Sequence, residues 1–94
     1  MGRENQGNEA MKPIRLTHHA REQCEERGAS EYEVKQAVIN GSRETAKSDR
    51  IICRYNFPFG QSWHGKIYQI KQVAPIIKET ATETIVITVY TFFF

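Results

Sequence analysis

The sequence predicts an α+β domain in which two N-terminal helices form an αα-hairpin packed on one face of a four- to five-stranded, mainly antiparallel sheet. Three observations lead to this class. A capped helical segment is followed by a second segment that begins with a capping box, and alternating apolar and polar segments fill the rest of the chain. The 94 residues, 39% hydrophobic and 26% charged, suit one globular domain.

The N-terminal segment differs from the rest of the chain. Its first ten residues are polar and show no periodicity, so we expect a disordered arm at 1–12 and a single domain at 13–94. The arm lacks the apolar segment of a secretory signal, and no run approaches the roughly 18 apolar residues of a membrane span. Two cysteines, Cys24 and Cys53, are too few for a disulfide scaffold. The sequence therefore predicts a cytoplasmic protein with no membrane partner.

Capping residues predict both helices. Thr17 is a good N-cap, and Gly28 is placed to end the first helix. Ser30 and Glu33 form a capping box at the start of the second helix. The predicted helices cover residues 18–27 and the segment from Ser30 to near Asn40-Gly41, with Val34, Ala37 and Val38 on the buried stripe of the second. A tight turn between them makes the αα-hairpin.

The remaining segments alternate as strands do. We expect strands at residues 13–16, 43–47, 50–57, 66–74 and 84–92, with turns at 48–49 and 78–83 and a loop at 58–65. Alternation in the last strand places Ile85, Ile87 and Val89 on one face, and Thr84, Val86, Thr88 and Tyr90 on the other. The resulting order is β-α-α-β-β-β-β, an antiparallel meander with both helices against one face.

On a helical wheel, Ala20, Cys24 and Arg27 fall within about 60° of one another, which predicts that they face the sheet. His18 then points to solvent, and His19 lies at the seam between helix and sheet. A helix N-terminus disfavours a second positive charge, so His19 could act as a neutral general base. The alternative is a structural histidine that hydrogen-bonds to the backbone. Arg27 either pairs with a protein group or contacts phosphate.

Charge is distributed unevenly. Residues 43–78 hold seven basic and two acidic residues, whereas residues 17–40 hold three basic and five acidic ones. This split suggests a cationic face for an anionic partner, although basic residues that merely solvate a sheet are an alternative.

The predicted strands suggest where that cationic face lies. If Ile51 and Ile85 face the helices, the opposite face of the sheet carries Arg50, Arg54, Thr88 and Tyr90, with Lys66 nearby. Guanidinium groups on phosphates and rings on bases are a means of holding RNA. We name Arg50, Trp63, His64 and Lys71 as candidate RNA-binding residues; for Trp63, plain packing of the loop is the alternative.

The sequence predicts neither a metal nor a nucleotide cofactor. Its three histidines and two cysteines show no CxxC or HxxxH spacing, and no carboxylate-rich cluster accompanies them. Glycine patterns of phosphate loops and dinucleotide sites are also absent from the sequence.

The segment THHAREQCEERGAS (residues 17–30), the EYEVKQAV helix and the final strand IVITVY resemble an uncharacterised bacterial domain family that looks like a branch of the RelE/ParE toxin superfamily. The likeness covers residues 14–91. It implies a RelE/ParE-like fold and an antitoxin partner. It also implies either metal-independent cleavage of mRNA on the ribosome or inhibition of DNA gyrase. His19 and Arg27 match the family's helix motif, whereas Gln23 stands where many relatives carry arginine.

The leading hypothesis is therefore a toxin of a type II toxin–antitoxin pair that acts as a metal-independent endoribonuclease. Cleavage needs proton transfer at the 2′-OH and the leaving oxygen, and charge stabilisation at phosphorus. We assign proton transfer to His19, with Tyr90 as the alternative. The supporting residues are Arg54 and Lys66 for charge stabilisation, and Arg27 for orienting His19 or the phosphate.

Two other hypotheses remain open. One is a non-catalytic module that binds gyrase, another protein or RNA. The YTFFF tail favours it, since its three terminal phenylalanines either cap the core or offer an apolar docking patch. The other is a degenerate, inactive toxin. The sequence also leaves a homodimer open.

Overall fold

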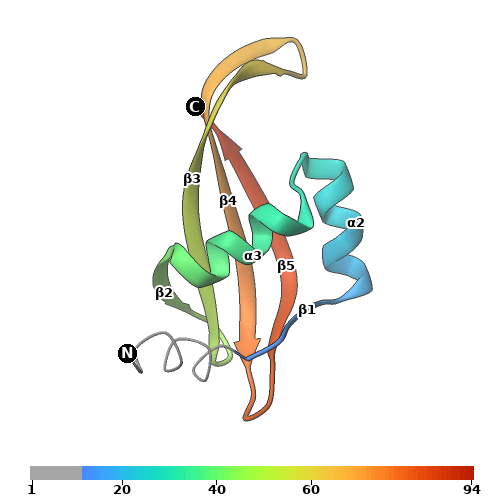
Figure 1. Ribbon diagram of the computed structural model, residues 1–94, viewed down its shortest axis with the longest axis vertical. Coiled ribbons are helices and arrows are strands. Elements are labelled where there is room, and N and C mark those ends of the chain that lie inside the picture. Colours follow the sequence, from blue (N-terminus) through green and yellow to red (C-terminus); the bar gives the residue numbers. More distant parts are fainter. Residues whose placement is uncertain (1–11) are drawn as a thin grey trace, which may run out of the picture.

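The structure, a computed structural model, describes residues 12–94, which form two helices and a sheet of five strands (Figure 1). In chain order these are β1 (Ile14–Leu16), α2 (His18–Arg27), α3 (Glu31–Asn40), β2 (Ser42–Ala46), β3 (Arg50–Trp63), β4 (Lys66–Glu79) and β5 (Thr84–Phe93). The strand order is β1-β5-β4-β3-β2. β1 runs parallel to β5, and the other neighbours are antiparallel. The arm predicted at 1–12 lies outside the described residues apart from Lys12, whose ammonium donates to Thr80 O.

Both helices begin and end where their caps predict. Thr17 Oγ1 accepts the Ala20 N–H at 3.1 Å, and Gly28 ends α2 with a left-handed φ of 75°. Ser30 and Glu33 make both bonds of the capping box, each 3.0 Å long. The structure therefore confirms both predicted helices. They could be predicted because a cap depends on residues close together in the sequence.

The predicted fold class is wrong. The helices pack on the sheet rather than pairing as an αα-hairpin: α2 lies along β5 and β1, and α3 crosses β3 and β4 (Figure 1). Each helix has ten residues, and strands take 55% of the described chain. The RelE/ParE-like arrangement is therefore replaced by a strand-dominated mixed sheet with two short helices. Each helix buries three residues against the sheet, which leaves little apolar surface for a helix–helix contact.

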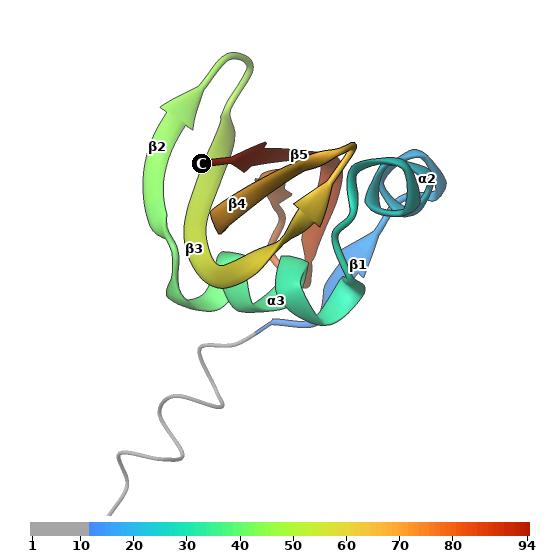
Figure 2. The ribbon, with the colours of Figure 1, turned by 90° about the horizontal axis from the view of Figure 1, so that it is seen from above.

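β3 and β4 form a longer hairpin than expected. Residues 58–63, predicted as a loop, continue β3, and His64 and Gly65 make a two-residue turn with positive φ at both positions. The pairing register shifts between Pro58 and Gln61. Beyond that shift the hairpin tip bends towards α2, as Figures 1 and 2 show.

β5 changes face at a β-bulge. Thr88 pairs with Ile76 while Val86 pairs with Ile77, so Ile87 is an extra residue in β5. The faces of β5 follow from this register: Thr84, Val86, Val89, Thr91 and Phe93 point to the helix side, and Ile85, Thr88, Tyr90 and Phe92 to the open side. Simple alternation therefore predicted the second half of the strand correctly and the first half wrongly.

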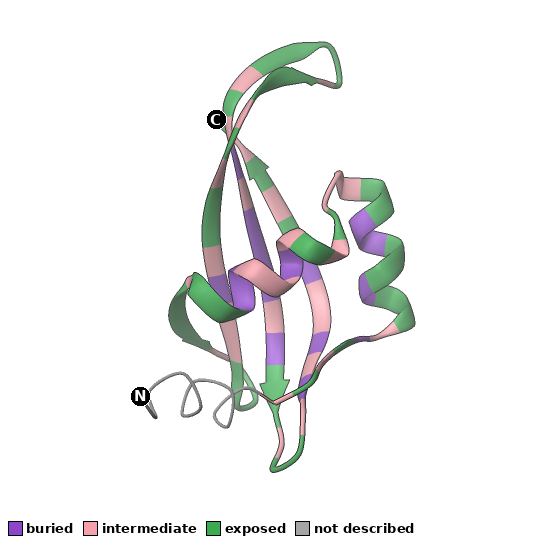
Figure 3. Cartoon of the chain, in the orientation of Figure 1, coloured by how far each residue is buried: buried purple, intermediate pink, exposed green. Residues whose placement is uncertain are grey.

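The core lies between the helices and the sheet. Figure 3 shows buried residues on the sheet-facing sides of α2 and α3 and along β4 and β5, whereas the hairpin tip is largely exposed. The core cluster contains Leu16, Ala20, Cys24, Val34, Ala37, Val38, Cys53, Val73, Ile77, Val86 and Val89. Burial raises the pKa of both cysteine thiols, which suits them to packing rather than to nucleophilic chemistry.

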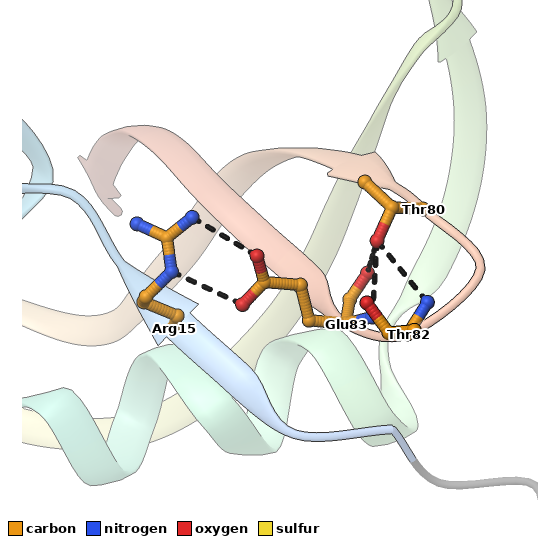
Figure 4. Close-up of polar contacts among 4 residues, drawn as sticks. All are labelled: Arg15, Thr80, Thr82 and Glu83. Atoms are coloured by element: carbon orange, nitrogen blue, oxygen red, sulfur yellow. Dashed lines mark hydrogen bonds and ion pairs between the residues drawn. The ribbon is translucent and has the colours of Figure 1, made fainter.

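A bidentate ion pair joins β1 to the turn between β4 and β5. Arg15 Nε and Nη2 donate to the two carboxylate oxygens of Glu83, each at 3.1 Å (Figure 4). The hydroxyl of Thr80 closes the same turn by accepting the Glu83 N–H at 3.0 Å. This pair lowers the pKa of Glu83, first through the hydrogen bonds from Arg15.

Candidate nucleic-acid interface

Side chains from α2 cover the edge of β5. β1 pairs with β5 over Thr84–Val86, and beyond that point the strand edge faces α2. Gln23 Oε1 accepts the Val89 N–H at 2.8 Å, and Arg27 Nη1 donates to Val89 O, also at 2.8 Å. Both backbone groups of Val89 are therefore satisfied by one helix, which protects the edge from pairing with another strand.

Four side chains form a ladder of alternating charge and aromatic rings, in the order Arg54, Phe92, Tyr90 and Arg27. The guanidinium carbon of Arg27 lies 5.0 Å from the centre of the Tyr90 ring, and that of Arg54 lies 5.7 Å from the centre of Phe92. The two rings lie 6.4 Å apart at 24°. Tyr90 is 39% exposed and Phe92 41%. The ladder therefore presents two solvent-facing rings with a guanidinium group at each end.

The register of the sheet places this ladder on the face away from the helices. Gln72 is the partner of Asn56 in β3 and of Phe92 in β5, so these three side chains share a face. Arg54 Nη1 donates to Gln72 Oε1 at 3.1 Å, and its Nε lies 3.4 Å from a carboxylate oxygen of Glu44. These contacts hold the guanidinium of Arg54 over the Phe92 ring.

Aromatic rings fix the hairpin tip against the end of β5. The Trp63 ring lies between His64, 4.4 Å away at 12°, and Phe93, 5.0 Å away at 18°. It also packs on Gly28 so closely that a Cβ there would lie 2.7 Å from the indole. Phe93 further contacts Phe59 and Tyr68. Both faces of Trp63 are thus covered, so packing accounts for it, and His64 is the exposed end of the stack.

A surface pocket, which we call the hairpin pocket, lies where the hairpin tip, the last turn of α2 and the end of β5 meet. It is lined by Glu26, Arg27, Trp63, His64, Tyr90, Thr91 and Phe93. Arg27 and Tyr90 belong to both the ladder and this pocket, so the two features are continuous.

The structure brings together five of the residues predicted from the sequence. Arg27, Tyr90, Trp63 and His64 line the hairpin pocket, and Arg54 joins them through Phe92. His19 does not belong to this group. It is exposed in the first turn of α2, eight residues before Arg27, or about 12 Å along the helix axis.

The other candidates lie apart from the ladder. Lys66 sits beside Tyr68 at the hairpin tip, with its ammonium 5.6 Å from the ring centre. Arg50 is exposed at the opposite end of β3. Lys71 is buried: its Nζ donates to Gly28 O at 2.8 Å and lies 2.9 Å from Glu33 Oε1. Lys71 is therefore a structural link to the turn between the helices and is not free to bind RNA.

The buried stripe of α2 also differs from the prediction. Gln23 is buried together with Ala20 and Cys24, whereas Arg27 is half-buried and reaches around the strand edge. The prediction that His19 lies at the seam is wrong, since that position faces solvent. His18 faces solvent as predicted and lies 3.1 Å from Glu22.

Sequence reasoning missed Phe92, Phe93 and Glu26 as parts of this region. The YTFFF tail was predicted either to cap the core or to form an apolar docking patch, but strand alternation separates its rings. Phe92 joins the ladder, Phe93 joins the ring stack, and Phe94 is 60% exposed while its backbone pairs with Ile70. The alternation itself was the signal that could have separated them.

Comparison of the chain with known protein families, with curated proteins and with solved structures finds no match. Among residues 12–94, no helix has the length and apolar character needed to cross a membrane.

Proposed function

We propose that this chain binds single-stranded RNA across the open face of the sheet. The ladder carries the proposal: two exposed rings provide stacking surfaces for bases, and the guanidinium groups beside them provide phosphate contacts. Arg50 and Lys78, which lie at the same end of the sheet, add positive charge to an RNA path that continues beyond the ladder.

A single strand fits this surface better than a duplex does. Bases within a duplex are stacked on one another and cannot reach Tyr90 and Phe92, whereas unpaired bases can be splayed onto protein rings. The sequence supports an anionic partner, because residues 43–78 carry a net charge of +5.

We further propose that the protein is a toxin that cleaves mRNA in the cytoplasm without a metal ion. A cognate antitoxin would hold this toxin inactive. The support for cleavage is that Arg27, His64 and Tyr90 line one pocket. In this form of the proposal, proton transfer moves from His19 to Tyr90 or His64, and Arg27 and Arg54 stabilise charge at phosphorus. The second candidate is a non-catalytic binding module, favoured by the fact that protein acceptors already hold both arginines.

Binding is tested by fluorescence anisotropy with a labelled single-stranded RNA of mixed sequence. We expect Tyr90→Leu to weaken binding roughly 5- to 100-fold, the range for loss of one stacking ring. Tyr32→Leu is the matched control, because Tyr32 is 69% exposed on α3. Equal affinities for the two variants would exclude the ladder as the binding surface.

The charge contribution is tested in the same assay as a function of salt. Arg54→Gln should lower the slope of log affinity against log salt by about one unit. Lys35→Gln on α3 makes the same change in net charge on the helix side and should leave the slope unaltered.

Cleavage is tested by mapping new RNA ends in the presence of a metal chelator, and in cells by mapping mRNA ends after induced expression. Tyr90→Phe keeps the ring and removes the hydroxyl, so it should leave binding intact and reduce cleavage if Tyr90 transfers the proton; undiminished cleavage would assign that step to His64. His19→Ala should change neither. RNA binding by the wild type without any cleavage would establish the non-catalytic module instead.

A further inference from the structure

The hairpin pocket has a chemical character that differs from the rest of the ladder. Along the ladder, the groups available to RNA are guanidinium groups and ring faces, which suit any base, and the Glu44 carboxylate there is paired with Arg54. The pocket adds a carboxylate without a partner among residues 12–94, that of Glu26, which precedes Arg27 in the last turn of α2 and lines the same pocket. A carboxylate repels phosphate, so its natural partner on RNA is a base edge that offers hydrogen-bond donors.

The pocket also offers a stacking platform. The imidazole of His64 lies parallel to Trp63, which in turn lies on Phe93, and the outer end of this stack is exposed. His64 takes a left-handed φ of 51° in a two-residue turn where asparagine or glycine is usual. The turn therefore holds an imidazole ring at the end of the stack, where a base can lie against it.

The two polar groups of the pocket match one base in particular. The Glu26 carboxylate has no hydrogen bond or ion pair with any other residue in the described part of the chain, so both of its oxygens remain available as acceptors. Arg27 uses Nη1 to bind Val89 O and retains further N–H donors. A donor group and two acceptor oxygens lining one pocket complement the guanine edge, which presents the O6 acceptor next to the N1–H and N2–H donors.

The other bases fit this arrangement less well. Adenine and cytosine each offer a carboxylate one amino donor next to a ring-nitrogen acceptor. Uracil offers one N–H between two carbonyl oxygens. In each case one oxygen of Glu26 would face an acceptor and lose its hydrogen bond.

We propose that the hairpin pocket binds a guanine base of the RNA strand that lies on the ladder. The base stacks on His64, Glu26 accepts its N1–H and N2–H, and Arg27 donates to O6. This inference rests on the proposed RNA binding and adds sequence preference to it. The ladder supplies affinity for any single strand, and the pocket fixes which base lies at its α2 end.

The test uses two labelled oligouridine strands of equal length, one with a single central guanosine and one with adenosine in its place. Wild-type protein should bind the guanosine strand roughly 5- to 100-fold more tightly, the range for one bidentate base contact. Glu26→Gln should abolish most of this preference and leave the affinity for the adenosine strand within about twofold. Glu25→Gln, the same charge change at the neighbouring residue outside the hairpin pocket, should keep the preference.

A third strand with inosine, which lacks the N2 amino group, should bind with intermediate affinity. Equal affinity of wild type for the guanosine and adenosine strands overturns the guanine pocket and leaves RNA binding standing, as does a preference that survives Glu26→Gln. Failure to bind any of the strands overturns the RNA-binding proposal itself. Trp63 fluorescence checks that each variant keeps the ring stack, since Trp63 is the protein's one tryptophan.

Discussion

The side-chain oxygen of Gln23 accepts the backbone N–H of Val89 at 2.8 Å across 66 residues of sequence. Gln23 is 7% exposed and Val89 is fully buried, so water cannot replace this bond. Together with the Arg27 bond to the carbonyl of Val89, it fixes α2 to the strand that carries Tyr90 and Phe92. The position of the ladder therefore depends on a buried glutamine at the edge of the sheet.

Replacing Gln23 should destabilise the protein. Gln23→Ala leaves the buried Val89 N–H without a partner, which costs about 1–3 kcal/mol of unfolding free energy. Gln61→Ala is the control, because Gln61 is exposed in the hairpin and should change stability by less than about 0.5 kcal/mol. Urea denaturation followed by circular dichroism measures both. A Gln23→Ala variant as stable as the control would show that this bond contributes nothing.

Gly28 should tolerate alanine less well than other glycines with positive φ. Gly28→Ala places a Cβ 2.7 Å from the Trp63 ring at a φ of 75°, whereas Gly65 has a φ of 84° and open space around it. Both variants incur left-handed strain of about 1–2 kcal/mol. Gly28→Ala should lose a further 1–3 kcal/mol or so from overpacking and shift the Trp63 emission. Equal losses in the two variants would mean that the indole does not rest on Gly28.

The ion pair between Arg15 and Glu83 should make the thermal stability of the protein depend on pH. Because the pKa of Glu83 is lower in the folded state than in the unfolded chain, the pair stabilises the fold above the unfolded pKa, and this contribution is lost as pH falls through the folded pKa. The Tm advantage of wild type over Glu83→Gln should thus shrink between about pH 7 and about pH 3. Glu25→Gln provides the control for a loss of charge. A Tm difference that stays constant over this pH range would show that the Arg15–Glu83 ion pair does not stabilise the fold.

The sequence predicted local features of the fold well. The ends of α2 and α3 were predictable because Thr17, Gly28, Ser30 and Glu33 act on backbone groups within a few residues. It predicted strand pairing less well, because pairing depends on distant partners. The Ile87 bulge, which changes the face of β5, becomes visible through the register with β4.

The length of the hairpin was missed for a related reason. Pro58 and Gly60 are turn residues in most contexts, and they suggested a loop. β2 pairs with β3 over residues 50–54, so Pro58 lies on a stretch of β3 that extends past β2, where a missing N–H is tolerated. The hairpin pocket depends on this extension, because the tip brings Trp63 and His64 to α2. No local pattern in the sequence predicted that contact.

Some candidate site residues were placed correctly from the sequence and others were not. Arg54 and Tyr90 were placed on the open face by alternation in strands, and the sheet register agrees. His19 was placed at the seam because it lies beside Gln23 on the helical wheel, but of these two residues only Gln23 is buried. A glutamine at a buried position is explained by the backbone of Val89, which lies far away in sequence.

The most direct measurement is ultraviolet cross-linking of the protein to single-stranded RNA, with the linked residues identified by mass spectrometry. Bases stacked on protein rings form cross-links to those rings, so we expect adducts at Tyr90 and Phe92 on the open face of the sheet. Cross-links confined to the helix side, for example at Tyr32 of α3, would contradict it.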